Sequence, residues 1–268
     1  MLVDITTLPQ EEIRKELDIS KIGASILSSK ELKYIFSALG VWFDYDHAKS
    51  IGIDNPPHPV LPSGIHTNCH IVHGALLHKS QITEVFAQQL ANRLILGQKL
   101  KKMKSIERLK YRDVWVIGPS YGAAFLVAAM AQYWNSWQGF TCKVVGIPMD
   151  YEWQSLPIPP GSLVQLVDDI IYSASADSLM ATRNAIKEMP SGRRIRLNKE
   201  IGVIINMSGK KKINNFRIKS LISLPPPNIW QSSNCPLCTQ GSKSLSIQNE
   251  WPQLANACWR EPPEPPEE

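Results

Sequence analysis

The sequence lacks any long apolar run, and its richest apolar stretch, residues 123–131, is far shorter than the ~20 residues that a membrane-spanning helix needs. Residues 1–20 carry acidic groups early and contain no continuous apolar stretch, so we expect no signal peptide there. Cysteine is scarce, since the chain has only five, in an odd and unevenly spaced set. Such a set suits reduced thiols better than a disulfide framework, which predicts a cytoplasmic protein without a membrane partner.

No strong excess of one charge is present either. The 268 residues carry a formal net charge of +5, and 43% of them are hydrophobic. This composition excludes a fibrous or wholly disordered protein, and the length is enough for one large domain or one domain with an appended subdomain. The modest positive charge indicates only a weak preference for phosphate-bearing ligands.

Short apolar runs alternate with helical patterns through the middle of the chain. Strands are predicted at residues 113–118, 143–149 and 163–167, and helices at 80–97, 123–134 and 178–189. This alternation is typical of an α/β protein with a parallel sheet covered by helices on both faces. Because such sheets bind ligands at the carboxyl ends of their strands, we expect a site at the loops that begin at Gly118 and Asp168.

The two ends of the chain follow other patterns. Ser28 precedes a predicted helix that Gly40 ends, whereas the proline-rich residues 41–62 are expected to form a loop. Residues 201–207 and 216–224 flank a turn-forming segment and predict two antiparallel strands, a late hairpin. We therefore divide the chain into four parts. A helical and hood segment spans residues 1–78, and a core with this hairpin spans residues 79–228. An extension containing Cys-Pro-Leu-Cys follows at residues 229–260, and a disordered acidic tail at residues 261–268.

The segment VQLVDDIIYSASA, residues 164–176, joins an apolar strand to two adjacent carboxylates, Asp168 and Asp169. Because desolvating both acids is costly, we expect them at the edge of the sheet, facing solvent or a ligand. Small residues follow at the start of a predicted helix, where backbone N–H groups can bind a phosphate. Carboxylates there can accept hydrogen bonds from sugar hydroxyls or hold a hydrated Mg²⁺. The alternative is a solvated acidic pair that caps the next helix.

This segment resembles the phosphoribosyl pyrophosphate (PRPP) motif of the type I phosphoribosyltransferases. The resemblance implies that the two acids contact the ribose hydroxyls and the magnesium shell. It also implies a cradle for the 5′-phosphate formed by Tyr172, Ser173, Ala174, Ser175 and Ala176. The family usually has Thr and Gly where this chain has Tyr172 and Ala174, which weakens the expected phosphate binding.

Further stretches resemble orotate phosphoribosyltransferase in the same order along the chain. LPSGIHTNCHI, residues 61–71, is similar to the substrate-binding stretch and implies substrate contacts for Ser63, Gly64 and His66. GPSYGAA, residues 118–124, is similar to the pyrophosphate loop and implies that role for Gly118, Pro119, Ser120 and Tyr121. The resemblance as a whole implies the type I phosphoribosyltransferase fold, a homodimer, and transfer of a 5-phosphoribosyl group from PRPP to a nucleobase with Mg²⁺.

Several departures from the family pattern concern cations. The pyrophosphate loop has Gly122 where the family has Lys, and residues 147–161 contain no basic residue where the family has a basic mobile loop. Asn206 and Met207 lie near the point where orotate enzymes have an Arg. These departures disfavour orotate as the substrate, and they leave open a non-catalytic regulatory protein that binds PRPP or a nucleotide.

Cys235 and Cys238 form a C-x₂-C pair that can give two thiolates to Zn²⁺, although a structural zinc needs four ligands. We expect Cys258 or a second subunit to supply the remaining zinc ligands. The alternative is that Cys235 and Cys238 are free or redox-active thiols. His66, His70 and His73 have spacings that suit one helical face; they either bind pyrophosphate or a base, or are satisfied polar residues at an interface. A basic run at residues 99–112 is expected to be a solvated surface rather than a nucleic-acid site, but with the cysteine pair it leaves a zinc-binding adaptor as a further alternative.

Overall fold

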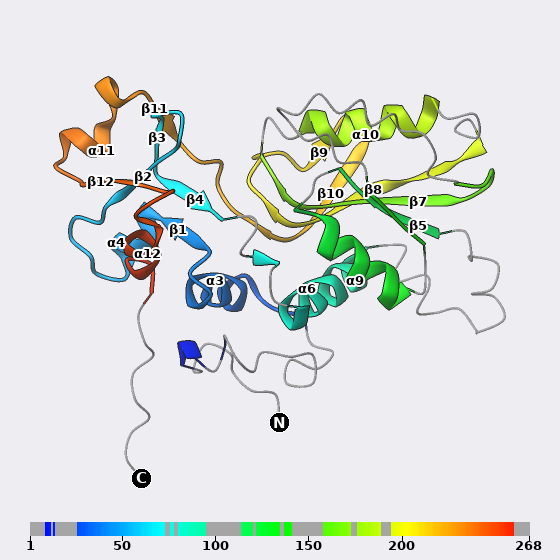
Figure 1. The fold of residues 1–268 in the computed structure, drawn as a ribbon, viewed down its shortest axis with the longest axis horizontal. Helices are drawn as coiled ribbons and strands as arrows, with labels where there is room; N and C mark the ends of the chain where they lie inside the picture. Colours follow the sequence, from blue (N-terminus) through cyan, green and yellow to red (C-terminus); the bar gives the residue numbers. More distant parts are fainter. Residues whose placement is uncertain are drawn as a thin grey trace, which may run out of the picture. The chain divides into compact units, whose positions relative to one another are not determined.

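The computed structural model describes residues 9–11, 13, 26–72, 76–77, 80–94, 114–119, 122–134, 137–140, 158–172, 176–188 and 194–259. The chain divides into two compact units (Figure 1). The first unit combines Met1–Leu76 with Pro227–Glu268, and the second is the uninterrupted stretch Leu77–Pro226. The two chain segments on either side of the core thus belong to one unit.

The second unit contains a six-stranded sheet with the strand order β6-β5-β7-β8-β10-β9. Every neighbouring pair is parallel except β10 and β9. The strands are β5 (Val114–Gly118), β6 (Trp137–Phe140), β7 (Leu163–Ile171), β8 (Arg196–Asn206), β9 (Lys212–Ile213) and β10 (Phe216–Ser223). All of β5 and nearly all of β7 are buried, as expected of strands covered on both faces.

Helices cover both faces of this sheet, with α10 on one face and α6 and α9 on the other (Figure 1). Leu179 and Ile186 of α10 lie in one hydrophobic cluster with Val203 of β8. The preceding residue of β8, Gly202, faces the opposite side of the sheet, since a Cβ atom built on it would lie 3.3 Å from Leu90 of α6. The predicted α/β fold with helices on both faces is therefore confirmed. The helices are α6 (Ser80–Arg93), α9 (Ala124–Trp134) and α10 (Ala176–Glu188).

The predicted antiparallel pairing of residues 201–207 with 216–224 is wrong, because β8 and β10 are parallel, with Ile205 opposite Ile222. The intervening segment reverses the chain twice. Gly209 and Asn214 have positive φ angles of 69° and 50°, and β9 between them runs antiparallel to β10. Two reversals restore the original direction. The turn-forming residues were thus recognised, but they form two turns instead of one.

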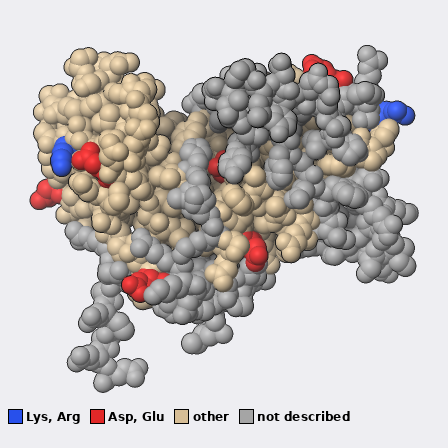
Figure 2. All heavy atoms as spheres, in the orientation of Figure 1, with Lys and Arg blue, Asp and Glu red and all other residues tan. Residues whose placement is uncertain are grey.

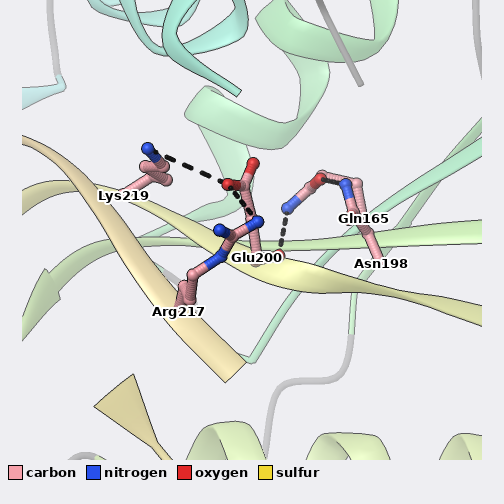
Figure 3. A network of polar contacts seen from close by, with 5 residues as sticks. All are labelled: Gln165, Asn198, Glu200, Arg217 and Lys219. Carbon is pink, nitrogen blue, oxygen red and sulfur yellow. Dashed lines mark hydrogen bonds and ion pairs between the residues drawn. The ribbon is translucent and has the colours of Figure 1, made fainter. Parts of the chain in front are cut away.

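An irregularity interrupts the pairing of β7 with β8, where Gln165 stands opposite the three residues 198–200. The buried Gln165 side chain bridges this gap (Figure 3). Its Nε2 donates to the backbone oxygens of Leu166 and Glu200, both at 2.8 Å, and its Oε1 accepts a 2.6 Å hydrogen bond from Asn198. A side-chain amide thus supplies hydrogen bonds that a regular ladder takes from the backbone.

The side chain of Glu200, next to this irregularity, is fully buried and meets two cations of β10 (Figure 3). Its Oε1 lies 3.3 Å from Arg217 Nη2 and 3.9 Å from Lys219 Nζ. The cationic side chains are themselves about half exposed, at 51% and 42%. A buried carboxylate requires such partners, because an isolated charge in the sheet would be strongly destabilising.

The first unit begins with α3 (Ser29–Ala38), which is capped as predicted. Ser28 Oγ accepts a hydrogen bond from Glu31 N, Glu31 Oε2 accepts one from Ser28 N, and Gly40 follows the helix end with a φ of 65°. Residues 41–62 are not one loop, because buried Trp42 and Phe43 begin a strand and Asp44 caps a short helix through His47 N at 2.8 Å. The elements there are β1 (Trp42–Asp44), α4 (Tyr45–Ser50) and β2 (His58–Val60).

The rest of the first unit is built from short elements of both chain segments. β1 pairs with β4 (Cys69–Ile71), and a four-stranded sheet has the order β11-β3-β2-β12. The remaining elements are β3 (His66–Thr67), β11 (Ile229–Trp230), the 3₁₀ helix η4 (Ser232–Asn234), α11 (Pro236–Thr239), β12 (Ser244–Ser246) and α12 (Trp251–Asn256). Among the described residues of both units, no helix is long and apolar enough to cross a membrane. The predicted strand at 143–149 and the tail at 261–268 lie outside the described residues.

Candidate active site and a histidine–cysteine cluster

The predicted site lies where two neighbouring parallel strands end at different heights. β5 ends at Gly118, and its pairing with β7 runs to Ile117 opposite Leu166. β7 continues to Ile171 and stays paired with β8. Asp168 and Asp169 therefore lie within β7, in the part that extends past β5, and not after the end of the strand as expected.

Both carboxylates are buried, each with only 2% of its surface exposed, so they do not face solvent. Backbone N–H groups of the strand partly compensate for this burial. Asp168 Oδ1 accepts a 3.0 Å hydrogen bond from Asp169 N, and Asp169 Oδ1 accepts a 2.9 Å hydrogen bond from Ile170 N. Such contacts offset part of the desolvation cost and hold the acidic pair in one orientation.

Gly122, which follows β5 by four residues, lies directly against Asp169. A Cβ built on Gly122 would overlap Asp169 Oδ2 and would lie 3.1 Å from its Cγ. The structure thus brings together the predicted pyrophosphate loop and the predicted ribose-binding acids. Gly118 and Pro119 of that loop are buried, whereas Ser120 and Tyr121 lie outside the described residues. Gly122 also leaves no room for the side chain that the family has at this point.

The predicted phosphate cradle spans the connection from β7 to α10. Tyr172 follows β7 directly and is half-buried, and Ala176 begins α10. Ser173, Ala174 and Ser175 lie outside the described residues. A strand therefore precedes the predicted cradle and a helix begins at its last residue, and a helix N-terminus can favour a bound anion.

Asn206 is the last residue of β8, and its side chain forms hydrogen bonds within the turn that follows. Its Nδ2 donates to Lys210 O at 2.9 Å, and its Oδ1 accepts hydrogen bonds from Ser208 N and Ser208 Oγ at 3.1 and 2.7 Å. An amide used in this way holds the first of the two chain reversals. Asn206 thus does not replace the Arg that orotate enzymes have near this point.

The residues predicted to contact the substrate belong to the first unit. Ser63 and Gly64 lie exposed in the turn between β2 and β3, and Gly64 has a φ of 77°. His66 lies in β3 and His70 in β4, so the helical face inferred from their spacing is wrong. His73 lies outside the described residues.

His66 instead belongs to a cluster with His58, Cys235 and Cys238. One ligand atom from each of the four residues lies within 4.8 Å of all the others. His66 Nδ1 lies 2.9 Å from His58 Nε2 and 3.4 Å from Cys238 Sγ. His58 Nε2 lies 3.6 Å from Cys235 Sγ and 3.5 Å from Cys238 Sγ. Four nitrogen and sulfur atoms placed in this way can hold a metal ion.

The other ring nitrogen of His58, Nδ1, forms a hydrogen bond with Ser242 Oγ. Ser242 Oγ donates its single proton to Pro56 O at 2.7 Å, so it accepts the 2.8 Å hydrogen bond from His58 Nδ1. The proton of His58 therefore lies on Nδ1, and the lone pair of Nε2 faces the cluster. Burial, and then the proximity of His66, lower the pKa of His58 to about 4, which favours the neutral ring.

The sequence indicated Cys235 and Cys238 as metal ligands, assigned His66 to the substrate side and missed His58. His58 is 177 residues from Cys235, within the proline-rich segment expected to be a loop, so no local spacing connects it to the cysteine pair. Cys258, the expected additional ligand, lies elsewhere. Its Sγ contacts Asp44 N at 3.3 Å and Asp44 O at 3.5 Å, and burial raises its pKa to about 12.

Comparisons with known proteins agree with the motifs. No family model matches the sequence. The chain is 26% identical over 181 residues to an orotate phosphoribosyltransferase of Desulforamulus reducens, which covers 68% of this chain and 82% of the relative. The predicted resemblance to the phosphoribosyltransferases is therefore confirmed.

The chain is also similar to several solved structures at lower sequence identity. Orotate phosphoribosyltransferase from Aeropyrum pernix has 17% identity and a TM-score of 0.47, over 72% of this chain and 93% of its own. UMP synthase of Leishmania donovani has 16% identity and a TM-score of 0.45 over 89% of this chain, which spans only 43% of that protein. An adenine phosphoribosyltransferase from Rhodothermus marinus has 14% identity and a TM-score of 0.40, over 60% of this chain and 95% of its own.

The basic run at residues 99–112 lies outside the described residues. On the face drawn in Figure 2, the Lys and Arg side chains of the described part of the chain are scattered. A continuous basic patch is the usual electrostatic signature of a nucleic-acid site. The described Lys and Arg side chains form no such patch on that face.

Proposed function

We propose that this protein binds PRPP with Mg²⁺ and transfers its 5-phosphoribosyl group to a nucleobase or a similar acceptor. The observation that carries the proposal is the packing of the Gly122 backbone against the Asp169 carboxylate. It joins two motifs that are 47 positions apart in the chain at the carboxyl ends of two neighbouring parallel strands. The orotate phosphoribosyltransferase relative supports the same reaction class.

Each loop has a separate role in this proposal. Asp168 and Asp169 accept hydrogen bonds from the ribose hydroxyls. Backbone N–H groups of residues 172–176 bind the 5′-phosphate at the N-terminus of α10, with Ser173 and Ser175 adding hydroxyl donors. The backbone of residues 118–121 binds the pyrophosphate that leaves. Acceptor-side contacts of Ser63 and Gly64, which belong to the first unit, stay a prediction from the sequence resemblance.

Two adjacent carboxylates fit a hard divalent cation, which prefers oxygen ligands. Mg²⁺, when bound, neutralises part of the negative charge that develops on the leaving pyrophosphate. The protein's own contribution is to hold the ribose in place and to orient the acceptor for attack on the C1 atom of the ribose. The acceptor nitrogen forms the new bond to the ribose C1 atom, and the bond from C1 to the pyrophosphate oxygen breaks with its electron pair leaving on that oxygen. The N–H proton of the acceptor passes to the departing pyrophosphate or to water. No nucleophilic side chain is required, so the rate would come from positioning and electrostatics.

The acceptor differs from orotate in this proposal. Recognition of the orotate carboxylate needs a cation, and Asn206 is uncharged and engaged with Ser208 and Lys210. A neutral nucleobase or a related heterocycle is therefore the better candidate. The homodimer and the cytoplasmic location remain predictions from the sequence.

Calorimetric titration with PRPP, with and without Mg²⁺, tests this proposal. We expect Mg²⁺-dependent binding that Asp168→Asn and Asp169→Asn each remove. Glu200→Gln is the matched control, because it changes an equally buried carboxylate of the same sheet that faces Arg217. Failure of the wild-type protein to bind PRPP under either condition would refute the proposal.

A second candidate function is a non-catalytic PRPP or nucleotide sensor. Gly122 favours it, because the Asp169 carboxylate fills the space that a side chain at this point would need. The site then lacks the loop cation that helps pyrophosphate to leave. PRPP binding without pyrophosphate release, across a panel of purine and pyrimidine bases, would favour the sensor over the transferase.

A further inference from the structure

We propose that His58, His66, Cys235 and Cys238 form a structural zinc site within the first unit, independent of PRPP binding. The four residues come from three places in the chain. His58 and His66 lie in the adjacent strands β2 and β3, whose register pairs Val60 with His66. Cys235 caps the short helix α11, and Cys238 is its third residue. Each residue presents a nitrogen or a sulfur atom to the same point.

The distances match a tetrahedral zinc ion. Zinc bonds of ~2.0–2.1 Å to nitrogen and ~2.3 Å to sulfur, at tetrahedral angles, place neighbouring nitrogen and sulfur ligands about 3.5 Å apart. Three of the four nitrogen–sulfur pairs lie 3.4, 3.5 and 3.6 Å apart, and the fourth pair, His66 with Cys235, lies within 4.8 Å. Two nitrogen ligands would lie about 3.4 Å apart, against the 2.9 Å between His58 and His66. A slight separation of the two rings completes the geometry.

The surroundings of His58 prepare it for ligation. Metal-binding histidines commonly donate their second ring N–H to a fixed acceptor, which sets the tautomer and the ring orientation. Ser242 Oγ is such an acceptor, and it is itself fixed by Pro56 O. The Nε2 lone pair of His58 is thereby aimed at Cys235 and Cys238, because no proton is left to occupy it.

The ligand set selects zinc and a structural role. Two thiolates and two imidazoles disfavour Mg²⁺ and Ca²⁺, which take oxygen ligands, and suit a tetrahedral zinc ion. Four protein ligands close the coordination shell and leave no position for a catalytic water. His66 is then a metal ligand, in place of the acceptor-side contact inferred from its sequence neighbourhood.

Such a site would cross-link the two chain segments that make up the first unit. The strands that join them are only two or three residues long, and short isolated strand pairs are marginally stable in water. The core around them is also modest, with Leu237 and Leu245 packed near Phe43 and Leu254. A metal held by both segments would therefore supply stability that the packing alone does not.

Metal analysis of the full-length protein, purified without chelators or added metal, tests this inference. We expect about one zinc per chain by mass spectrometry. Cobalt substitution should give the visible bands of a tetrahedral thiolate site. Cys235→Ala should lose the zinc, whereas Cys258→Ala should keep it. The two variants are matched, because both residues are buried in the same hydrophobic cluster.

Cys238→Ser provides a second variant that does not disturb the core, because Cys238 is exposed. It should lose the zinc while the α/β circular dichroism signal of the second unit is kept. Removing the metal from the wild type with a chelator should lower its melting temperature, and the same treatment should leave Cys238→Ser unchanged. Wild-type protein that contains no zinc and takes up none on titration would overturn the inference, as would a Cys235–Cys238 disulfide in freshly purified protein.

Discussion

Replacing Gly122 with alanine tests the contact on which the candidate active site depends. The new methyl group would overlap Asp169 Oδ2, with Cγ and Oδ1 at 3.1 and 3.4 Å. Overpacking of this kind costs about 1–3 kcal/mol. The φ angle of Gly122 lies outside the left-handed region, so alanine is otherwise tolerated there and recovers ~0.4–1 kcal/mol by restricting the unfolded chain. We expect a net loss of about 0.5–2 kcal/mol in unfolding free energy.

A double-mutant cycle with Asp169→Ala isolates this contact. Removing the carboxylate removes the atoms that clash, so Gly122→Ala should then be neutral or stabilising by up to about 1 kcal/mol. Urea unfolding of the four proteins should therefore show a coupling energy of about 1–3 kcal/mol. Titration with PRPP and Mg²⁺ should show that Gly122→Ala alone prevents binding, because the carboxylate is displaced. Additive effects on stability, or unchanged PRPP binding by Gly122→Ala, would contradict the described packing.

Three other outcomes follow from the described contacts. Gln165→Leu should lower the unfolding free energy by about 1–3 kcal/mol in urea titrations, because it leaves buried backbone oxygens at the strand irregularity without their donor. Arg217→Ala and Lys219→Ala together should cost more than the sum of the single variants, since either cation alone still pairs with the buried glutamate of β8; an additive result would argue against a shared partner. In native protein treated with a chelator at pH 8, iodoacetamide should label the exposed Cys238 well before Cys258, because burial raises the pKa of Cys258 to about 12. Peptide mass spectrometry measures the labelling, and early labelling of Cys258 would contradict the prediction.

Sequence patterns were sufficient for the sheet where each strand is a simple apolar run. β5 appears in the sequence as VWVIG and the first part of β7 as LVQLV, and such apolar runs are typical of strands that are buried on both faces. The continuation of β7 through Asp168 and Asp169 to Ile171 was not predicted. The pairing of β8 with β10 was not predictable in the same way. Strand direction depends on how many times the connection turns, and a segment with both Gly209 and Asn214 is compatible with one reversal or with two.

The two sites differ in how local their sequence signals are. Asp168 and Asp169 lie within one motif, so the sequence alone made them candidates, although it did not predict their burial within β7. The histidine–cysteine cluster depends on contacts across the chain. Cys235 and Cys238 form a local pair, but His58 reaches them only because β2 pairs with β12, and that pairing has no local signature.

The discontinuous first unit has a consequence for synthesis on the ribosome. About 170 residues separate His66 from Cys235, so at ~5–20 residues per second the nascent chain waits roughly ten to thirty seconds between the two halves of the cluster. During that interval β2 and β3 have been made, but their partners β12 and β11 have not. The second unit, being continuous, can fold first. The early segment meanwhile exposes unpaired strand edges, which makes it a natural client for chaperones until translation ends.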